Sequence, residues 1–402
     1  MTIGGDLRAA RERAGVSLDD LAEQIGLSKG HLSRVERGVR PVTPSLIRSY
    51  ELALGVTVAA TAPGGDVGTV DDVKRRALLG SIAAASVGTA AAEPLARIFD
   101  AEATPPNRVA LADVEAVEHA TALYMSMDLA RHGAMAAAMA RGALEWATGL
   151  LRGHMDDRTR QRLCSATGLL ADRLGWATFD AGAEPRALNL LTFALDSAAR
   201  GPDRDLRAHI MLDLSSVLAH MGHPADGVEV LRMALGDERI SSAEQANLHA
   251  VAARHCAAAG DIEGGLRHVE RAEAALERDV GAIAPEWARS ITYSPGHHDS
   301  ALGLALFALG EDDRARERLN AALARLDPGR TRTGLRCLIR LAALDLRAGE
   351  RAEAERRARR AAAVAAEVRS TRVAGDLAML AEQAERYGMR DLAAELTSAA
   401  AR

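Results

Sequence analysis

A short segment near the N-terminus carries the side chains best suited to binding chemistry, because it combines positive charge with small hydroxyl groups. Residues 28–48 contain one lysine and four arginines but a single acid, in a chain whose formal net charge is −5. Such a basic surface suits phosphate, and neutralising phosphates supplies most of the non-specific affinity for nucleic acid. The residues that we expect to face phosphates or bases are Ser28, Lys29, Gly30, His31, Ser33, Arg34, Arg37 and Arg40.

Two short helices joined by a glycine turn are predicted to position this segment. Ser17 and Asp20 form a capping-box pattern, and the apolar residues that follow recur at i, i+3, i+4 and i+7. Gly26 suits the left-handed turn that ends this first helix. The second helix turns Leu32 and Val35 inward, so its basic side chains fall on the opposite, exposed face. The N-terminus of this helix favours phosphate through its free N–H groups and positive dipole end.

A charged residue on the apolar side of the preceding helix needs a partner. Arg11 lies on the same helical stripe as Leu7, Ala10 and Ala14. Burying a guanidinium without a partner is costly, so we expect an ion pair with Glu36, which flanks the inward face of the second motif helix.

Residues 7–55 resemble the lambda-repressor-like, XRE-type helix-turn-helix domain, through the internal Arg–Glu pair and the segment LSRVERG. The resemblance implies double-stranded operator DNA as a partner. Gly30 stands where members of that family often have a base-reading side chain. Direct readout would then depend on Lys29, His31 and Arg34, of which Arg34 best suits a bidentate contact with guanine. The residues expected to contact phosphates are Ser28, Ser33, Arg37 and Arg40.

The rest of the chain is predicted to consist of repeated helix pairs. Aromatic residues make up only 3% of the sequence, which favours close helix packing over β-sandwiches or barrels. From about residue 108 a glycine recurs near the end of apolar segments, and an alanine follows each glycine by twelve residues. The glycine permits a turn between paired helices, and the alanine lets the second helix approach the first. The recurring glycines are Gly175, Gly222, Gly260, Gly310, Gly349 and Gly388.

This pattern resembles a degenerate tetratricopeptide (TPR) array, in which helix pairs stack into a superhelix with a concave surface. We therefore expect an all-α chain with a helix-turn-helix domain at residues 1–57, a linker with a connecting helix at 58–107 and a TPR-like α-solenoid at 108–402. Arg75 and Arg76, before an apolar stretch, also fit a twin-arginine export signal. Their position behind a DNA-binding domain favours the connecting helix.

The longest interval between the recurring glycines runs for 50 residues, from Gly260 to Gly310. Insertions in repeat arrays map to one face, which is often the binding face. The candidate contacts for an effector or partner in this interval are Trp287, Tyr293, His297 and His298. The alternative is an inter-helix loop whose aromatic side chains pack locally. The two adjacent histidines lack a third ligand at helical spacing, so we expect no metal.

Other features exclude several classes of protein. Only two of the 50 basic residues are lysines, and neither Lys29 nor Lys74 lies in a phosphate-binding P-loop motif. Zinc-protease, nucleophile-elbow and Rossmann motifs are absent from the sequence, so we expect no enzymatic activity and no cofactor. The three cysteines are far apart and predict buried thiols. No apolar run approaches the ~20 residues that span a membrane, and we expect a cytoplasmic protein.

An XRE-type domain ahead of a TPR-like array resembles the peptide-responsive bacterial regulators. The resemblance implies a transcriptional regulator that binds its operator as a homodimer and senses a small molecule or peptide in the concavity of the superhelix. A second hypothesis, of another class, is a DNA-binding protein whose array is a scaffold for a protein partner.

Overall fold

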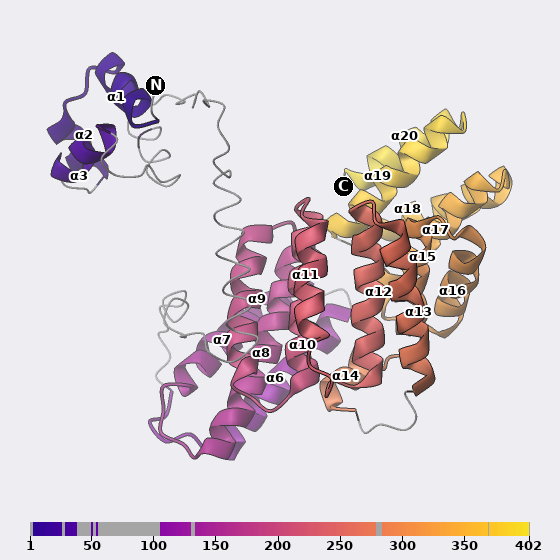
Figure 1. Ribbon diagram of the computed structural model, residues 1–402, viewed down its shortest axis with the longest axis horizontal. Helices are drawn as coiled ribbons and strands as arrows, with labels where there is room; N and C mark the ends of the chain where they lie inside the picture. The colour runs from indigo at the N-terminus through magenta and orange to yellow at the C-terminus, as the bar shows by residue number, and fades with distance from the viewer. Residues whose placement is uncertain are drawn as a thin grey trace. The chain divides into compact units, whose positions relative to one another are not determined.

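The computed structural model describes residues 3–25, 29–37, 50, 54, 105–129, 133–278, 284–368 and 370–401. These parts are α-helical, apart from turns and a single isolated bridge between Arg108 and His154 (Figure 1). The predicted all-α class is therefore confirmed. The chain divides into two compact units, Met1–Leu78 and Leu79–Arg402, which are described separately below. Most of the predicted linker lies outside the described residues, and the predicted domain boundaries stay predictions.

In the first unit, helices α1 (Ile3–Arg13), α2 (Leu18–Ile25) and α3 (Lys29–Glu36) surround a small apolar core. The predicted capping box at the start of α2 is confirmed. The Asp20 amide donates to Ser17 Oγ at 3.1 Å, and that hydroxyl donates to the Asp20 carboxylate at 2.6 Å. The predicted turn at Gly26 lies outside the described residues. The buried side chains of this core are Leu7, Ala10, Leu21, Ala22, Leu32, Val35 and Tyr50.

The second unit is a series of helix pairs, as the repeat predicts. Consecutive helices pack in pairs, and each pair also packs on the next. The helices of this unit are α6 (Leu111–Leu129), α7 (Gly133–Leu150), α8 (Asp157–Asp180), α9 (Glu184–Ala199), α10 (Arg204–His220), α11 (Pro224–Ala234), α12 (Ser242–Ala258), α13 (Ile262–Arg278), α14 (Glu286–Ser290), α15 (His297–Leu309), α16 (Asp312–Arg325), α17 (Thr331–Arg347), α18 (Arg351–Ala365), α19 (Thr371–Arg386) and α20 (Arg390–Ala400). None of the described helices is long and apolar enough to cross a membrane.

The turn glycines are confirmed with one correction. Gly175 was predicted to end a helix, but it lies inside α8, where an added Cβ would be 2.9 Å from the Leu191 side chain of α9. Gly182, with φ of 81°, makes the turn between these helices instead. Counted from Gly182, the first interval is 40 residues instead of 47, and the alanine twelve residues later, Ala194, is fully buried. The five remaining predicted turn glycines all have positive φ angles: Gly222, Gly260, Gly310, Gly349 and Gly388.

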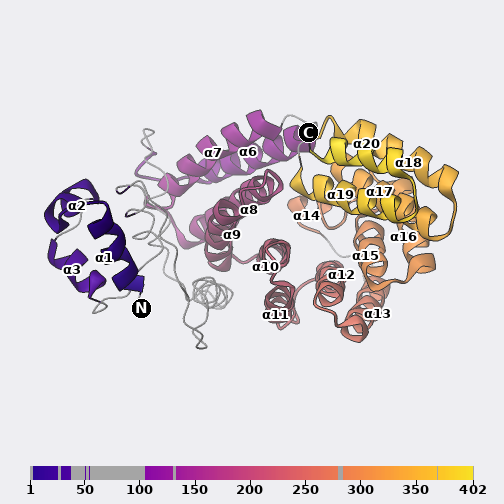
Figure 2. The same ribbon diagram turned by 90° about the horizontal axis from the view of Figure 1, so that it is seen from above.

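The helix pairs follow one another around a curve, and early helices of the array contact late ones (Figure 2). Asp180, at the end of α8, accepts hydrogen bonds from Ser370 Oγ at 2.6 Å and Arg372 Nε at 2.8 Å, beside and within the start of α19. Arg332 of α17 bonds Asp128 of α6 at 2.9 Å. Residues about 200 positions apart therefore lie together, and the curve closes on itself.

All three cysteines, Cys164, Cys256 and Cys337, are buried and unpaired, as the sequence predicts. Burial raises the pKa of each of these thiols, so they are inert packing residues at neutral pH.

Candidate functional site

In the first unit, a buried ion pair between Arg11 and Glu36 holds α3 against α1. Arg11 donates two hydrogen bonds of 2.7 Å to the two carboxylate oxygens of Glu36, and a third, of 3.1 Å, to the carbonyl of Val16. The Tyr50 hydroxyl also donates to Glu36, at 3.0 Å. The carboxylate is only 4% exposed, and burial together with its charge raises the pKa of Tyr50. The predicted pair is present, and Tyr50 is a further partner that the sequence did not reveal.

With its apolar face held in this way, α3 exposes basic side chains on the opposite side. Leu32 and Val35 are fully buried, whereas Lys29, Gly30 and Arg34 are exposed. A Cβ added at Gly30 would lie 3.7 Å from a guanidinium nitrogen of Arg34, so this guanidinium lies beside the bare backbone of Gly30, one turn towards the helix N-terminus. A methyl group at position 30 would be in ordinary van der Waals contact with this guanidinium, so Arg34 lies along the exposed face of α3 beside residue 30.

Two of the basic side chains are already engaged within the protein. Lys29 Nζ lies 2.6 Å from Asp19 on α2, although both side chains are more than half exposed. Arg37 Nε donates to the Ser33 carbonyl at 3.1 Å. Exposed contacts of this kind are worth little, so a DNA phosphate can displace them. Of the other predicted contacts, Ser28 and Arg40 lie outside the described residues, and the His31 side chain is not described.

In the second unit the curved array encloses a cavity of about 1030 Å³. Its wall comes mainly from α6 and from the inward helices α8, α10, α12, α15, α17 and α19, with one residue each from α7 (Ala137) and α14 (Ser290) and the turns beside them. Among the described residues, the outer helices α9, α11, α13, α16, α18 and α20 contribute nothing to this wall. The cavity is therefore the concave surface that the repeat pattern predicts.

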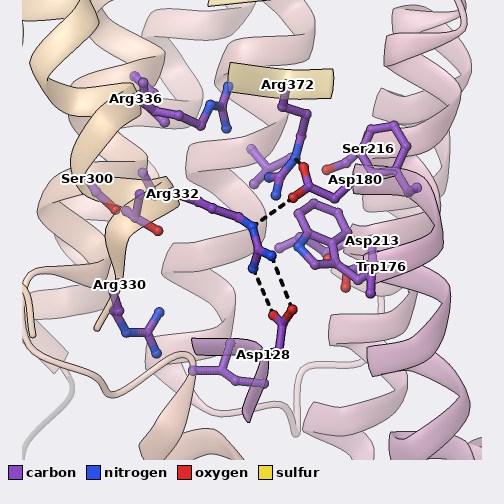
Figure 3. A pocket seen from close by; sticks show the side chains of 18 of the residues that line it. Asp128, Trp176, Asp180, Asp213, Ser216, Ser300, Arg330, Arg332, Arg336 and Arg372 are labelled. Carbon is purple, nitrogen blue, oxygen red and sulfur yellow. Dashed lines mark hydrogen bonds and ion pairs between the residues drawn. The ribbon is translucent and has the colours of Figure 1, made fainter. Parts of the chain in front are cut away.

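Six arginines and five carboxylates line this cavity. Figure 3 shows how several of them lie. Arg332 bonds Asp128 at 2.9 and 3.2 Å and lies 3.1 Å from Asp180, which also accepts from Arg372. The Arg372 guanidinium stacks over the ring of Trp176, 4.3 Å from its centre. Aspartates from the early helices thus hold arginines from the late helices in place.

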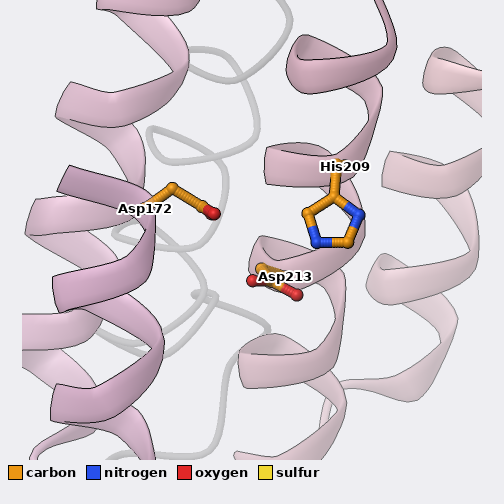
Figure 4. Close-up of side chains that lie close together, drawn as sticks. All are labelled: Asp172, His209 and Asp213. Carbon is orange, nitrogen blue, oxygen red and sulfur yellow. The ribbon is translucent and has the colours of Figure 1, made fainter. Parts of the chain in front are cut away.

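A second buried cluster consists of Asp172, His209 and Asp213, whose ligand atoms are close enough to hold a metal ion (Figure 4). Arg173, however, already pairs with both aspartates, at 2.8 Å from Asp213. The imidazole of His209 lies 3.0 Å from the carboxylate of Glu244. Because a guanidinium already neutralises these carboxylates, the cluster fits a buried ion-pair network better than a metal site.

This network gives a pH prediction. Burial and the neighbouring Asp172 raise the pKa of Asp213 to about 7, well above its value in the unfolded chain. The folded protein therefore holds a proton that the unfolded chain releases, so its stability should fall as pH rises from 5 to 7. Relative to Asp213→Asn, which cannot ionise, wild type should lose up to about 1.4 kcal/mol per pH unit. Urea denaturation of both proteins between pH 5 and 8 measures this difference, and parallel curves would contradict it.

The predicted effector residues of the longest interval do not gather at the cavity. His297 lines it, and its imidazole lies 3.0 Å from the Asn247 side chain. Trp287 is 8% exposed and packs elsewhere, donating to Asp203 at 2.8 Å and contacting the ring of His209. Tyr293 and His298 are partly buried but are not among the residues that line the cavity.

The arginines of the cavity were missed from the sequence, although they left a signal there. Arg332 and Arg336, which line the cavity, recur with Arg340 at i, i+4 and i+8 on α17. A basic stripe on the inward helix of a repeat marks a charged concave wall.

Comparison with known proteins identifies the first unit more closely than the second. A comparison with curated proteins finds no match. Among solved structures, the chain is similar to Bacillus thuringiensis PlcR, determined in complex with the peptide PapR7 and DNA, with 12% identity and a TM-score of 0.34 over 80% of this chain and 92% of that one. It is also similar to a Podosopora anserina protein described as a kinesin light chain with nearly identical TPR-like repeats, with 20% identity and a TM-score of 0.33 over 53% and 98%. The family described as "Helix-turn-helix domain" matches residues 2–63. The N-terminal part of this chain therefore carries a helix-turn-helix domain, and a TPR-like array of helix pairs follows it.

Proposed function

We propose that this chain is a sequence-specific DNA-binding transcriptional regulator whose TPR-like array binds an effector, a small molecule or peptide, in its central cavity. The observation that carries the DNA-binding part is the exposed face of α3. The Arg11–Glu36 pair and two fully buried apolar side chains fix the opposite face of this helix, so Arg34 projects from a rigid support. A helix held in this way can place one guanidinium against a base edge in the major groove.

The cavity supports the regulatory part of the proposal. Its volume of about 1030 Å³ suits a small organic ligand or a short peptide, and charged and aromatic side chains converge on it. A ligand can regulate DNA binding only if it binds the DNA-competent and incompetent states with different affinity. Closure of the array through contacts between distant helices provides an element that a ligand can bias.

We further propose that the chain forms a homodimer, which acts on two DNA half-sites in the cytoplasm and has no catalytic activity.

The DNA-binding part is tested by two arginine variants. Arg34→Ala should weaken binding to the preferred DNA site by about 1–3 kcal/mol and relax the preference at one base pair, because a base contact carries sequence information. Arg37→Ala should weaken binding to specific and random DNA about equally, because a phosphate contact does not. The preferred site is first selected from random duplexes with the wild-type chain. Both variants are then titrated against this site and a scrambled duplex at one fixed salt concentration.

Arg8→Ala is a suitable control, since Arg8 is an exposed arginine of α1 that pairs with Glu12 and is not part of the basic face of α3. Its binding to both duplexes should match that of wild type. Equal loss of specificity in the Arg34 and Arg37 variants would show that another face of the domain reads the DNA.

A further inference from the structure

The guanidiniums on one side of the cavity outnumber the carboxylates that pair with them. Asp376 is shared by Arg336, at 2.7 Å, and by Arg340, which lies next to the wall without lining the cavity itself. Asp180 is shared in the same way by Arg332 and Arg372, and Asp128 adds one further carboxylate. These three carboxylates face four paired guanidiniums, whose side chains are only 14 to 28% exposed.

Arg254 of α12 adds a fifth guanidinium to this group. It lines the cavity, is largely buried, and within the described part of the chain makes no ion pair with a carboxylate. Burial and the charges of Arg336, Arg372 and Arg340 lower the pKa of Arg254 to about 9. A guanidinium nevertheless keeps its proton at neutral pH. Asp376 is the carboxylate that offsets its charge most, and two other arginines already bond Asp376.

A hydroxyl group on the neighbouring inward helix is also without a partner. Ser216 of α10 lines the cavity and is 7% exposed, yet its hydroxyl makes no hydrogen bond within the described residues (Figure 3). Ser215, next to Ser216 on α10, has its Oγ 3.3 Å from Nε2 of His255, which is next to Arg254 on α12. Ser216 and Arg254 therefore occupy neighbouring positions on two adjacent helices. A buried donor without a partner is costly, unless a ligand or an ordered water accepts from it.

The cavity wall also offers apolar surface. Trp176, Phe179, Leu212, Val251 and Leu304 all line the cavity. The Arg372 guanidinium lies over the Trp176 ring, and its Nε donates to Asp180. The lining contains six arginines and five carboxylates, so the site combines an excess of one positive charge with an aromatic and aliphatic wall.

We propose that this wall is an oxyanion-binding site, in which Arg254 and the arginines around it bind the carboxylate or phosphate group of an organic anion with an apolar body. The inference rests on the proposed function in one respect, since it names the chemical class of the effector that the cavity takes. The anion supplies the negative charge that the side chains lack, and Ser216 donates to one of its oxygens.

Calorimetric titration of the full chain tests this site with three probes that each contain an unbranched chain of six carbon atoms: hexanoate, hexyl phosphate and uncharged hexanol. Ionic strength is held constant. At least one anion should bind wild type about tenfold or more tightly than hexanol does, because charge-assisted hydrogen bonds are available only to anions. The stronger anion identifies the carboxylate or the phosphate as the preferred group. Equal affinity for all three probes would overturn the proposal.

Variants of Arg254 test whether the binding occurs at this wall. Arg254→Gln should lose about tenfold in affinity for the preferred anion and none for hexanol, while Arg254→Lys, which keeps the charge, should lose less. Arg267→Gln is the matched control, because Arg267 lies on the outer helix α13, is exposed and pairs only with Glu263. Without ligand, Arg254→Gln should melt no lower than wild type, since no internal pair is broken. Equal anion binding by both glutamine variants would also overturn the proposal.

The proposed regulatory function and the proposed anion site can be disproved independently of each other. DNA binding by Arg254→Gln without ligand should equal that of wild type, because Arg254 lies in the other unit from α3. If anions do not bind but Arg34→Ala behaves as predicted, the DNA-binding function stands and the anion site is wrong. If anions bind through Arg254 but α3 does not read DNA, the anion site stands and the regulatory role is wrong.

Discussion

Glu36→Ala is expected to destabilise the helix-turn-helix unit by about 3–5 kcal/mol, because it leaves the buried guanidinium of Arg11 without its partner. Glu36 accepts two hydrogen bonds from Arg11 and one from Tyr50, and its carboxylate is 4% exposed. The variant strands both donors inside an apolar core. Since this core also orients α3, DNA binding should be lost together with stability.

Hydrogen exchange of the full chain measures the effect where it occurs. Amides of residues 3–25 and 29–37 should exchange at least a hundredfold faster in Glu36→Ala, while those of the helical array should not change. Glu12→Ala is the control, because Glu12 is an exposed partner of Arg8 that also lies 3.9 Å from the Arg11 guanidinium. An exposed pair of this kind contributes little, so this variant should have little effect. The double variant Arg11→Met, Glu36→Leu should recover part of the loss, since it strands no charge. Exchange in Glu36→Ala that matches the Glu12 control would mean that the pair does not hold the unit together.

The helix-turn-helix unit was predictable because its signals are local. The capping box at Ser17 and Asp20 and the stripe that contains Leu32 and Val35 lie within one or two helical turns. The Arg11–Glu36 pair followed from one requirement, that a charge on an apolar stripe has a partner. Tyr50 lies 14 residues after Glu36, and nothing in the sequence indicates that its hydroxyl reaches this carboxylate.

The array was predictable as a repeat but not in every turn. Gly175 and Gly182 are seven residues apart, and the sequence alone gives no reason to prefer one as the turn. The structure separates their roles physically. Gly182 has the left-handed φ that a turn needs, whereas Gly175 lets α9 pack closely against α8. A recurring glycine therefore has two possible causes, and only the backbone distinguishes them.

The cavity could not be located from the sequence, because its wall depends on contacts between residues far apart in the chain. The longest interval is a candidate because insertions in repeat arrays map to one face, yet Trp287 of this interval bonds Asp203 and does not line the cavity. Of the residues chosen there, only His297 reaches the wall. The role of Arg332 of α17 in the cavity wall can be recognised only once Asp128 and Asp180 are known to lie opposite it.

Asp180 is the residue on which this closure most depends. Its carboxylate is 6% exposed and contacts the Ser370 hydroxyl at 2.6 Å, Arg372 at 2.8 Å and Arg332 at 3.1 Å. Thr371 also donates to the backbone carbonyl of Asp180, at 3.3 Å. One side chain at the end of α8 thus binds both α17 and the start of α19, so removing it leaves two largely buried guanidiniums short of a partner.

Asp180→Ala is therefore expected to weaken the closing contacts by about 3–5 kcal/mol, the cost of breaking a buried ion pair from one side. Hydrogen exchange should accelerate most in residues 370–376 and at the end of α8, while pairs such as α12 and α13 keep their protection. Asp180→Asn keeps an acceptor for Ser370 but no charge, so its exchange rates should fall between those of wild type and Asp180→Ala.

Asp312→Ala removes a half-exposed partner of Arg347 and is the control for losing an aspartate from the array. If residues 370–376 exchange alike in the Asp180 and Asp312 variants, the curve is held closed by apolar packing between its helices, and an anion that competes for Arg332 and Arg372 could not open it.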